Sequence, residues 1–130
     1  MTAKKMFHPI DPKQEIHDAI KDGLVGMELF NNQVLVAIYV RPEKTASGII
    51  LTDKYRDEDK YQGKVGLVIK KGPVAFVGDD DWFKGVSVDL DDWILFRPSD
   101  GWQVEVNGVP CRVLNDVSVK GKIPNPDLLW

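Results

Sequence analysis

The stretch that decides the fold is a short apolar segment, Gln33-Val34-Leu35-Val36-Ala37-Ile38-Tyr39-Val40. Successive side chains of a β-strand point to opposite faces of the sheet, and here both alternating sets are apolar. This pattern is typical of a strand that is buried on both sides or that lies at a subunit interface. Val34 and Val36 are therefore candidate subunit-contact residues.

Further β patterns lie C-terminal to this strand, separated by turn residues. The pair Asn107-Gly108 is a strong signal for a two-residue hairpin turn, because both residues tolerate positive φ. Upstream, Asp11 and Pro12 mark the start of one short amphipathic helix over 12–22. Short strands with a single helix predict an all-β barrel or sandwich. The other expected strands are 63–70, 93–96, 103–106, 111–114 and 117–120.

Length and composition favour a single domain with no nucleic-acid or membrane partner. The chain has 130 residues, which is enough to bury a core without disulfides or metal ions. Its 17 basic and 20 acidic residues give a formal charge of −3, which offers no electrostatic support for nucleic-acid binding. The chain does not start with the apolar run of a signal peptide, so we expect a cytoplasmic protein.

The chain divides into an N-terminal arm with the helix (1–30), a β domain (31–123) and an apolar C-terminal tail (124–130). The helix has an apolar stripe that must dock on its own β domain or on a neighbouring subunit. The tail ends in Leu128, Leu129 and Trp130, although a disordered tail is usually polar. These three residues are therefore expected to contact this chain or a neighbour, and they are further subunit-contact candidates.

Residues with catalytic or metal-binding potential form no recognisable arrangement. Cys111 is the only cysteine, and it lies in a strand pattern typical of a small buried apolar residue. The acidic run at 79–81 lacks the glycine and glutamate of a calcium-binding EF-hand loop. Acidic residues 57–59 are interpreted as solvated loop charges. We therefore predict no enzyme activity, no catalytic residue, no cofactor and no metal site.

A long polar segment over 42–61 follows the first strand and contains one compact apolar group. Loops of this length are uncommon in compact domains and are usually functional or disordered. The apolar group consists of Ile49, Ile50 and Leu51, preceded by Gly48. An exposed aliphatic group on such a loop indicates a partner surface. The alternative is that these residues form one strand of an ordinary hairpin.

The order of these motifs resembles that of the GroES-type co-chaperonins, the chaperonin 10 family. In that family a strand leads into a mobile loop with a Gly-Ile-Val/Ile-Leu pattern, a Gly-x-Val strand, a roof hairpin and a further strand. The resemblance extends over about 30–123. The matching pieces here are Thr45-Ala46-Ser47-Gly48-Ile49-Ile50-Leu51-Thr52, Gly63-Lys64-Val65, Gly72, the segment 72–88, and Leu90-Asp91-Asp92-Trp93-Ile94-Leu95-Phe96.

The resemblance implies a small antiparallel GroES-like β-barrel with a long mobile loop, assembled into a homo-oligomeric ring of seven subunits. Such a ring caps a GroEL-type chaperonin and assists ATP-dependent protein folding. The chaperonin-binding residues would be Gly48, Ile49, Ile50 and Leu51.

The resemblance also implies a roof hairpin, which we expect over 73–86, exposed to solvent and contributing little to stability. Its tip would be acidic and its aromatic side chains could pair across the hairpin. The roof residues would be Phe76, Asp79, Asp80, Asp81, Trp82 and Phe83.

The sequence departs from the family pattern at two glycine positions, occupied here by Ser47 and Asp91, and in its added arm and tail. Such divergence suggests a virus-encoded member, which would act in the host cytoplasm. It leaves open an alternative function, a virion cement, neck or decoration protein that reuses the GroES-like barrel. Its partners would then be capsid or neck proteins.

Overall fold

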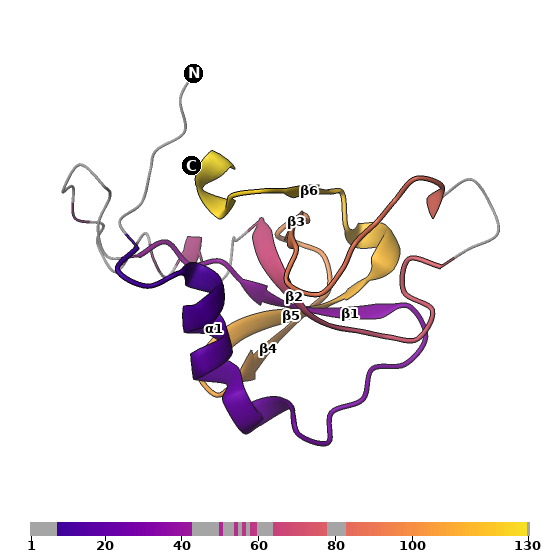
Figure 1. Ribbon diagram of the computed structural model, residues 1–130, viewed down its shortest axis with the longest axis horizontal. Helices are drawn as coiled ribbons and strands as arrows, with labels where there is room; N and C mark the ends of the chain where they lie inside the picture. Colours follow the sequence, from indigo (N-terminus) through magenta and orange to yellow (C-terminus); the bar gives the residue numbers. More distant parts are fainter. Residues whose placement is uncertain are drawn as a thin grey trace.

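The structure, a computed structural model, describes residues 8–42, 64–77 and 83–129, together with residues 50, 54, 56, 58 and 59. Figure 1 shows one antiparallel sheet with a short helix beside it. The elements are α1 (Pro12–Ile20), η1 (Lys21–Leu24), β1 (Gln33–Ile38), β2 (Val65–Lys71), β3 (Trp93–Leu95), β4 (Trp102–Val106), β5 (Val109–Asn115), η3 (Asp116–Ser118), β6 (Gly121–Ile123) and η4 (Pro126–Leu129).

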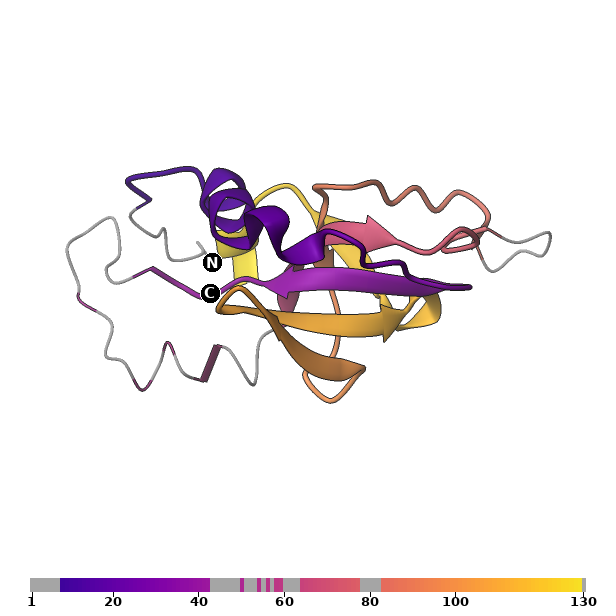
Figure 2. The same ribbon diagram turned by 90° about the horizontal axis from the view of Figure 1, so that it is seen from below.

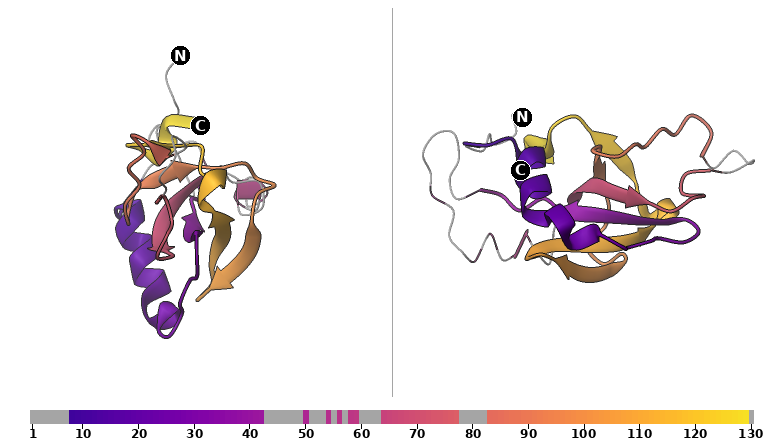
Figure 3. Two further views of the ribbon diagram at one scale, coloured as in Figure 1. Left: turned by 90° about the vertical axis from the view of Figure 1, so that its right-hand side faces the viewer. Right: turned by 60° about the horizontal axis from the view of Figure 1, so that its bottom comes forward.

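The sheet has six strands in the order β4-β5-β1-β2-β3-β6, and every neighbouring pair is antiparallel. Seen from the end, the strands curve around one another and α1 lies outside them (Figure 3). These residues therefore form the small all-β fold with one short helix that the sequence predicts.

The central strand β1 is buried on both faces. Leu35 and Ala37 belong to an apolar cluster that also includes Ile20 at the end of α1. Val34 and Val36 belong to a second cluster, on the other face of the strand, and neither has any exposed surface. Burial within one chain thus explains both apolar faces. Val34 and Val36 offer no surface to a second subunit, so their assignment as subunit-contact residues is corrected.

Helix α1 starts as predicted and docks on the chain's own β domain. The Asp11 carboxylate accepts a hydrogen bond of 2.9 Å from the Lys13 backbone N–H, and Pro12 occupies the first turn. The helix ends at Ile20 and continues as η1, whose Gly23 lies so close to Val106 that a Cβ atom would approach it to 2.7 Å. Figure 2 shows α1 lying along the side of the sheet.

The β4–β5 hairpin is closed by the predicted two-residue turn. Asn107 and Gly108 have φ values of 49° and 79°, as this tight turn requires. The Asn107 side chain also donates a hydrogen bond of 2.8 Å to the carbonyl of Ile20, the last residue of α1. The hairpin turn therefore caps the C-terminal end of the helix.

The strand expected over 117–120 is wrong. The chain turns there as η3, and the last strand, β6, comes later at 121–123 and pairs with β3. The cause is the buried carboxylate of Asp116, which accepts hydrogen bonds from the Asn32 side chain at 2.9 Å and the Phe76 backbone N–H at 3.1 Å. These bonds hold the chain in a turn where the apolar pattern alone predicted a strand.

Candidate functional site

The predicted binding segment lies between β1 and β2. Of its residues the structure describes Ile50, whose side chain is 70% exposed, and which belongs to none of the six sheet strands. Gly48, Ile49 and Leu51 lie outside the described residues. An isoleucine so exposed adds little to the core of this chain, and most of its apolar surface is open to solvent.

The two ends of this connection meet at a buried ion pair. Arg41 follows the end of β1, and Asp59 lies 18 positions later. The Asp59 Oδ2 atom accepts 2.8 Å hydrogen bonds from the Arg41 backbone N–H and Nε, and Oδ1 accepts one of 2.9 Å from Nη2. Asp59 is 2% exposed, so its interpretation as a solvated loop charge is wrong. The cause is Arg41, whose guanidinium compensates the buried carboxylate.

A second buried cluster joins the end of β1 to both ends of the described chain. The Tyr39 hydroxyl donates a short hydrogen bond to Oδ1 of Asp127 in η4. His8 Nε2 lies 3.0 Å from Oδ2 of the same carboxylate and 3.2 Å from the Tyr39 hydroxyl. Figures 1 and 2 show α1, η4 and the end of β1 at the same end of the molecule.

The environment of Tyr39 keeps its hydroxyl protonated. The side chain is 3% exposed, and its ring meets that of Trp93 edge-on at 5.6 Å. Burial raises the pKa of Tyr39 well above its usual range, and the hydrogen bond to Asp127 raises it further. Tyr39 is therefore a hydrogen-bond donor that holds the C-terminal segment on β1.

The C-terminal segment is held on the β domain by a polar residue, although the sequence analysis expected its apolar residues to make the contacts. Asp127 is 7% exposed, whereas Leu128 is 50% exposed. The side chain of Leu129 and the whole of Trp130 lie outside the described residues. Asp127 thus anchors the tail on this chain, and Leu128 keeps apolar surface that a neighbouring subunit could cover.

The predicted roof segment is only partly separate from the core. The rings of Phe76 and Phe83 meet edge-on at 5.9 Å, consistent with the expected aromatic pairing. Ala75 is 7% exposed and belongs to the second apolar cluster, so the expectation that all of 73–86 is exposed and adds little to stability is corrected. Asp79, Asp80, Asp81 and Trp82 lie outside the described residues.

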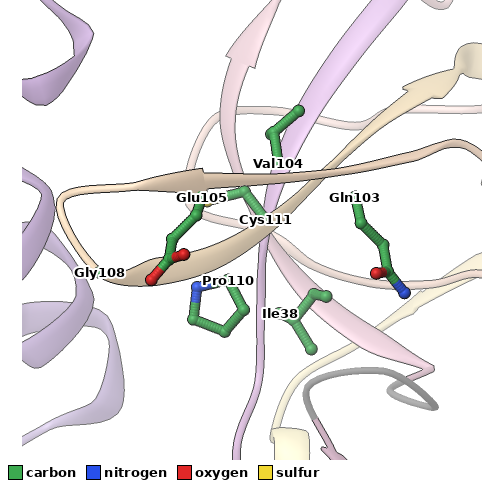
Figure 4. A pocket seen from close by; sticks show the side chains of 7 residues that line it. All are labelled: Ile38, Gln103, Val104, Glu105, Gly108, Pro110 and Cys111. Atoms are coloured by element: carbon green, nitrogen blue, oxygen red, sulfur yellow. The ribbon is translucent and has the colours of Figure 1, made fainter.

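Cys111 lines a pocket of about 280 Å³ beside the β4–β5 hairpin (Figure 4). Its side chain is 1% exposed, and burial raises the pKa of the thiol to about 12. A thiol that stays protonated at neutral pH is a poor nucleophile. This agrees with the interpretation of Cys111 as a small buried apolar residue. The pocket is lined by Ile38, Gln103, Val104, Glu105, Gly108, Pro110 and Cys111.

The described part of the chain has neither a metal-binding cluster nor a membrane-spanning helix. There, no group of three or more His, Cys, Asp or Glu side chains is placed to hold a metal ion. The helices among the same residues are too short or too polar to cross a membrane.

Comparison with known proteins places this architecture in a family. The family model for the chaperonin 10 kDa subunit matches residues 27–123, so the chain belongs to this family. The co-chaperonin GroES of Halothermothrix orenii is 29% identical over 91 residues, which cover 70% of this chain and 89% of the relative. The co-chaperonin GroES of Nitrosospira multiformis is 28% identical over 93 residues, covering 72% of this chain and 92% of the relative.

The match identifies which parts of the molecule belong to the family. The β strands lie within the matched residues, whereas α1 and η4 lie outside them. Sequence reasoning missed Tyr39, Asp59 and Asp127 as buried polar residues. No local signal marks them, because their partners lie 18 to 119 positions away in the chain.

Proposed function

We propose that this chain is a co-chaperonin subunit that caps a GroEL-type chaperonin and assists ATP-dependent protein folding. The observation that carries the proposal is the exposure of Ile50, at 70%, between β1 and β2 of a chaperonin 10 family fold. The segment Gly48-Ile49-Ile50-Leu51 would insert its aliphatic side chains into an apolar groove of the chaperonin. The family match favours this function over the virion protein that the sequence left open.

The free energy of one contact between a loop and a chaperonin groove suits a subunit that must bind the chaperonin and be released again. Burying each of Ile49, Ile50 and Leu51 contributes roughly 1.5–3 kcal/mol. Ordering the surrounding backbone costs roughly 1–2 kcal/mol per residue, which offsets much of this gain. One loop would therefore bind weakly, and several identical loops on one ring would bind tightly through their high effective concentration.

We further propose that the subunits form a homo-oligomeric ring of seven. The family membership supports this arrangement, and the half-exposed Leu128 is a candidate contact residue together with Leu129 and Trp130. Native mass spectrometry of the purified protein should give a single heptameric species. A monomer at micromolar concentration would contradict the proposal.

The binding role of Ile50 is tested by the variant Ile50→Asp. A carboxylate in an apolar groove costs several kcal/mol when it is buried, and this cost recurs in each loop of the ring. The variant should lose chaperonin binding, measured by native mass spectrometry with a GroEL-type chaperonin and ATP, and should keep the wild-type melting temperature. The matched control is Val25→Asp, which introduces the same charge at a side chain that is 80% exposed on the N-terminal arm.

The control should bind the chaperonin as the wild type does. If Ile50→Asp also binds normally, the segment is not the binding site. If the variant instead unfolds, Ile50 belongs to a core, which is incompatible with its proposed role.

A further inference from the structure

The connection that carries Ile50 starts and ends at the ion pair of Arg41 with Asp59, here called the Arg41–Asp59 clasp. We propose that this clasp is a positioning device: it fixes where the chaperonin-binding segment leaves the β domain and where it returns. The inference rests on the proposed function. Arg41 and Asp59 are positioning residues, because neither needs to touch the chaperonin for the clasp to act.

The geometry of the clasp makes it persistent. The Arg41 guanidinium meets both carboxylate oxygens, and the planar fork of an arginine fits a carboxylate in this way better than a lysine does. The side chains are only 13% and 1% exposed. Water therefore screens the pair little, and opening it would leave a buried charge without compensation. An exposed surface ion pair would give no such constraint.

The clasp is attached to the sheet on the side where β1 ends and β2 begins. Tyr39, two positions before Arg41, donates a backbone hydrogen bond of 2.9 Å to the carbonyl of Val65 at the start of β2. Arg56 Nε donates a hydrogen bond of 3.2 Å to the Arg41 carbonyl. Asp59 and Arg56 are therefore both bonded to Arg41, two positions after a residue that is bonded to the start of β2.

Fixed ends reduce the conformational entropy that the binding segment loses when it docks on the chaperonin. A chain whose ends are already held close together has fewer conformations than one whose ends are free, so binding orders fewer residues. The clasp also sets the direction in which each loop of a ring leaves its subunit. Equal directions are required for several loops to reach equivalent grooves at the same time.

The test compares three variants of the full chain. The double variant Arg41→Met/Asp59→Leu removes the clasp without leaving a buried unpaired charge. Arg41→Lys keeps the charge but loses the two-pronged contact. The control, Arg97→Met/Asp100→Asn, removes an ion pair between positions 97 and 100 whose arginine is 68% exposed. Affinity for a GroEL-type chaperonin is measured with ATP, together with the melting temperature of each variant.

We expect each loop of the double variant to bind roughly tenfold more weakly, because about one further backbone residue must be ordered. This cost recurs in every loop, so the affinity of the whole ring should fall by more than about tenfold. Arg41→Lys should show a smaller loss of affinity than the double variant, and the affinity of the control should stay within about twofold of the wild-type value. Hydrogen exchange gives a readout that needs no chaperonin. The Arg41 amide, bonded to Asp59, should be protected in the wild type and in the control, and exposed in the double variant.

The outcomes separate the two proposals. If the wild type binds no chaperonin, the proposed function fails, and the positioning role fails with it. If the wild type binds and both clasp variants bind equally well, the positioning role alone is overturned. An unprotected Arg41 amide in the wild type would also overturn it, because the clasp would then not be closed in solution.

Discussion

The two ends of β1 are both held by buried aspartates, which come from different parts of the molecule. At the end that starts with Gln33, Asp116 accepts hydrogen bonds from an amide side chain and from a backbone N–H, both neutral. At the opposite end, Asp59 faces a guanidinium and Asp127 faces a phenol. The first aspartate lies in η3, a turn that directly follows β5. The other two lie in the β1–β2 connection and in the C-terminal segment.

This contrast indicates how the fold combines the six-stranded sheet and its short turns, here called the frame, with longer connections. Near Asp116 the carboxylate stabilises a turn of the frame. Near Tyr39, Asp59 comes from the connection that follows β1 and Asp127 comes from η4, which lies outside the residues matched by the family model. The frame and its additions are therefore joined at one place. We therefore expect substitutions at Asp116 to affect the stability of the whole sheet, and substitutions near Tyr39 to act first on the segments attached there.

The largest effect is expected for Asp116→Ala, which leaves the Asn32 amide and the Phe76 N–H without an acceptor. The free energy of unfolding should fall by about 2–4 kcal/mol, because two partly buried donors lose their acceptor. Asp116→Asn, with one remaining oxygen, should give an intermediate loss. Denaturant unfolding measures both, with the exposed Asp22→Ala as control. Equal stabilities of the Ala and Asn variants would contradict the two-donor arrangement.

A smaller effect is expected for Tyr39→Phe, which removes only the hydroxyl that donates a hydrogen bond to Asp127. The free energy of unfolding should fall by about 1.5–3 kcal/mol, the range for a hydrogen bond to a charged group. Hydrogen exchange should show the loss of protection first in η4, at residues 126–129. Ser99→Ala, which removes an exposed hydroxyl, serves as control. Uniform loss of protection across the sheet would place Tyr39 in the frame and remove the contrast between the two ends.

The smallest effect on folding is expected for Leu128→Ser, since this side chain is 50% exposed and Asp127 already holds the segment. The free energy of unfolding of the subunit should change by no more than about 0.5 kcal/mol. Analytical ultracentrifugation should show the ring dissociating at a higher protein concentration than the wild-type ring. An unchanged dissociation with normal folding would exclude Leu128 from the subunit contacts.

The sequence predicts the sheet well where the pattern is local. The strand predicted over 33–40, the turn at Asn107-Gly108 and the helix start at Asp11 each depend on neighbouring residues. The turn and the helix start are confirmed, and the strand is found over 33–38, two residues shorter than predicted. The strand expected over 117–120 is wrong, because two distant contacts of the Asp116 carboxylate, with Asn32 and Phe76, override the apolar pattern.

The candidate site shows the same limit. The aliphatic group around Ile50 is visible in the sequence because it stands out from a polar segment. The clasp and the Tyr39–Asp127 contact are not visible, because charged residues such as Asp59 are exposed in most proteins and nothing near them in the chain indicates a partner. A buried ion pair between positions 41 and 59 becomes predictable only once the two strands that flank the connection are known to be neighbours.

The strand order also determines when the chain can fold during synthesis. β1 lies in the middle of the sheet, yet one of its two neighbours is β5, where Gln33 pairs with Asn115. On the ribosome, β1 and β2 can pair early, but β1 must wait with one open edge until almost the whole chain has emerged. Topologies that depend on such distant pairings fold slowly, on a scale of about milliseconds to seconds. A nascent co-chaperonin of this type would itself expose an unpaired strand during that interval.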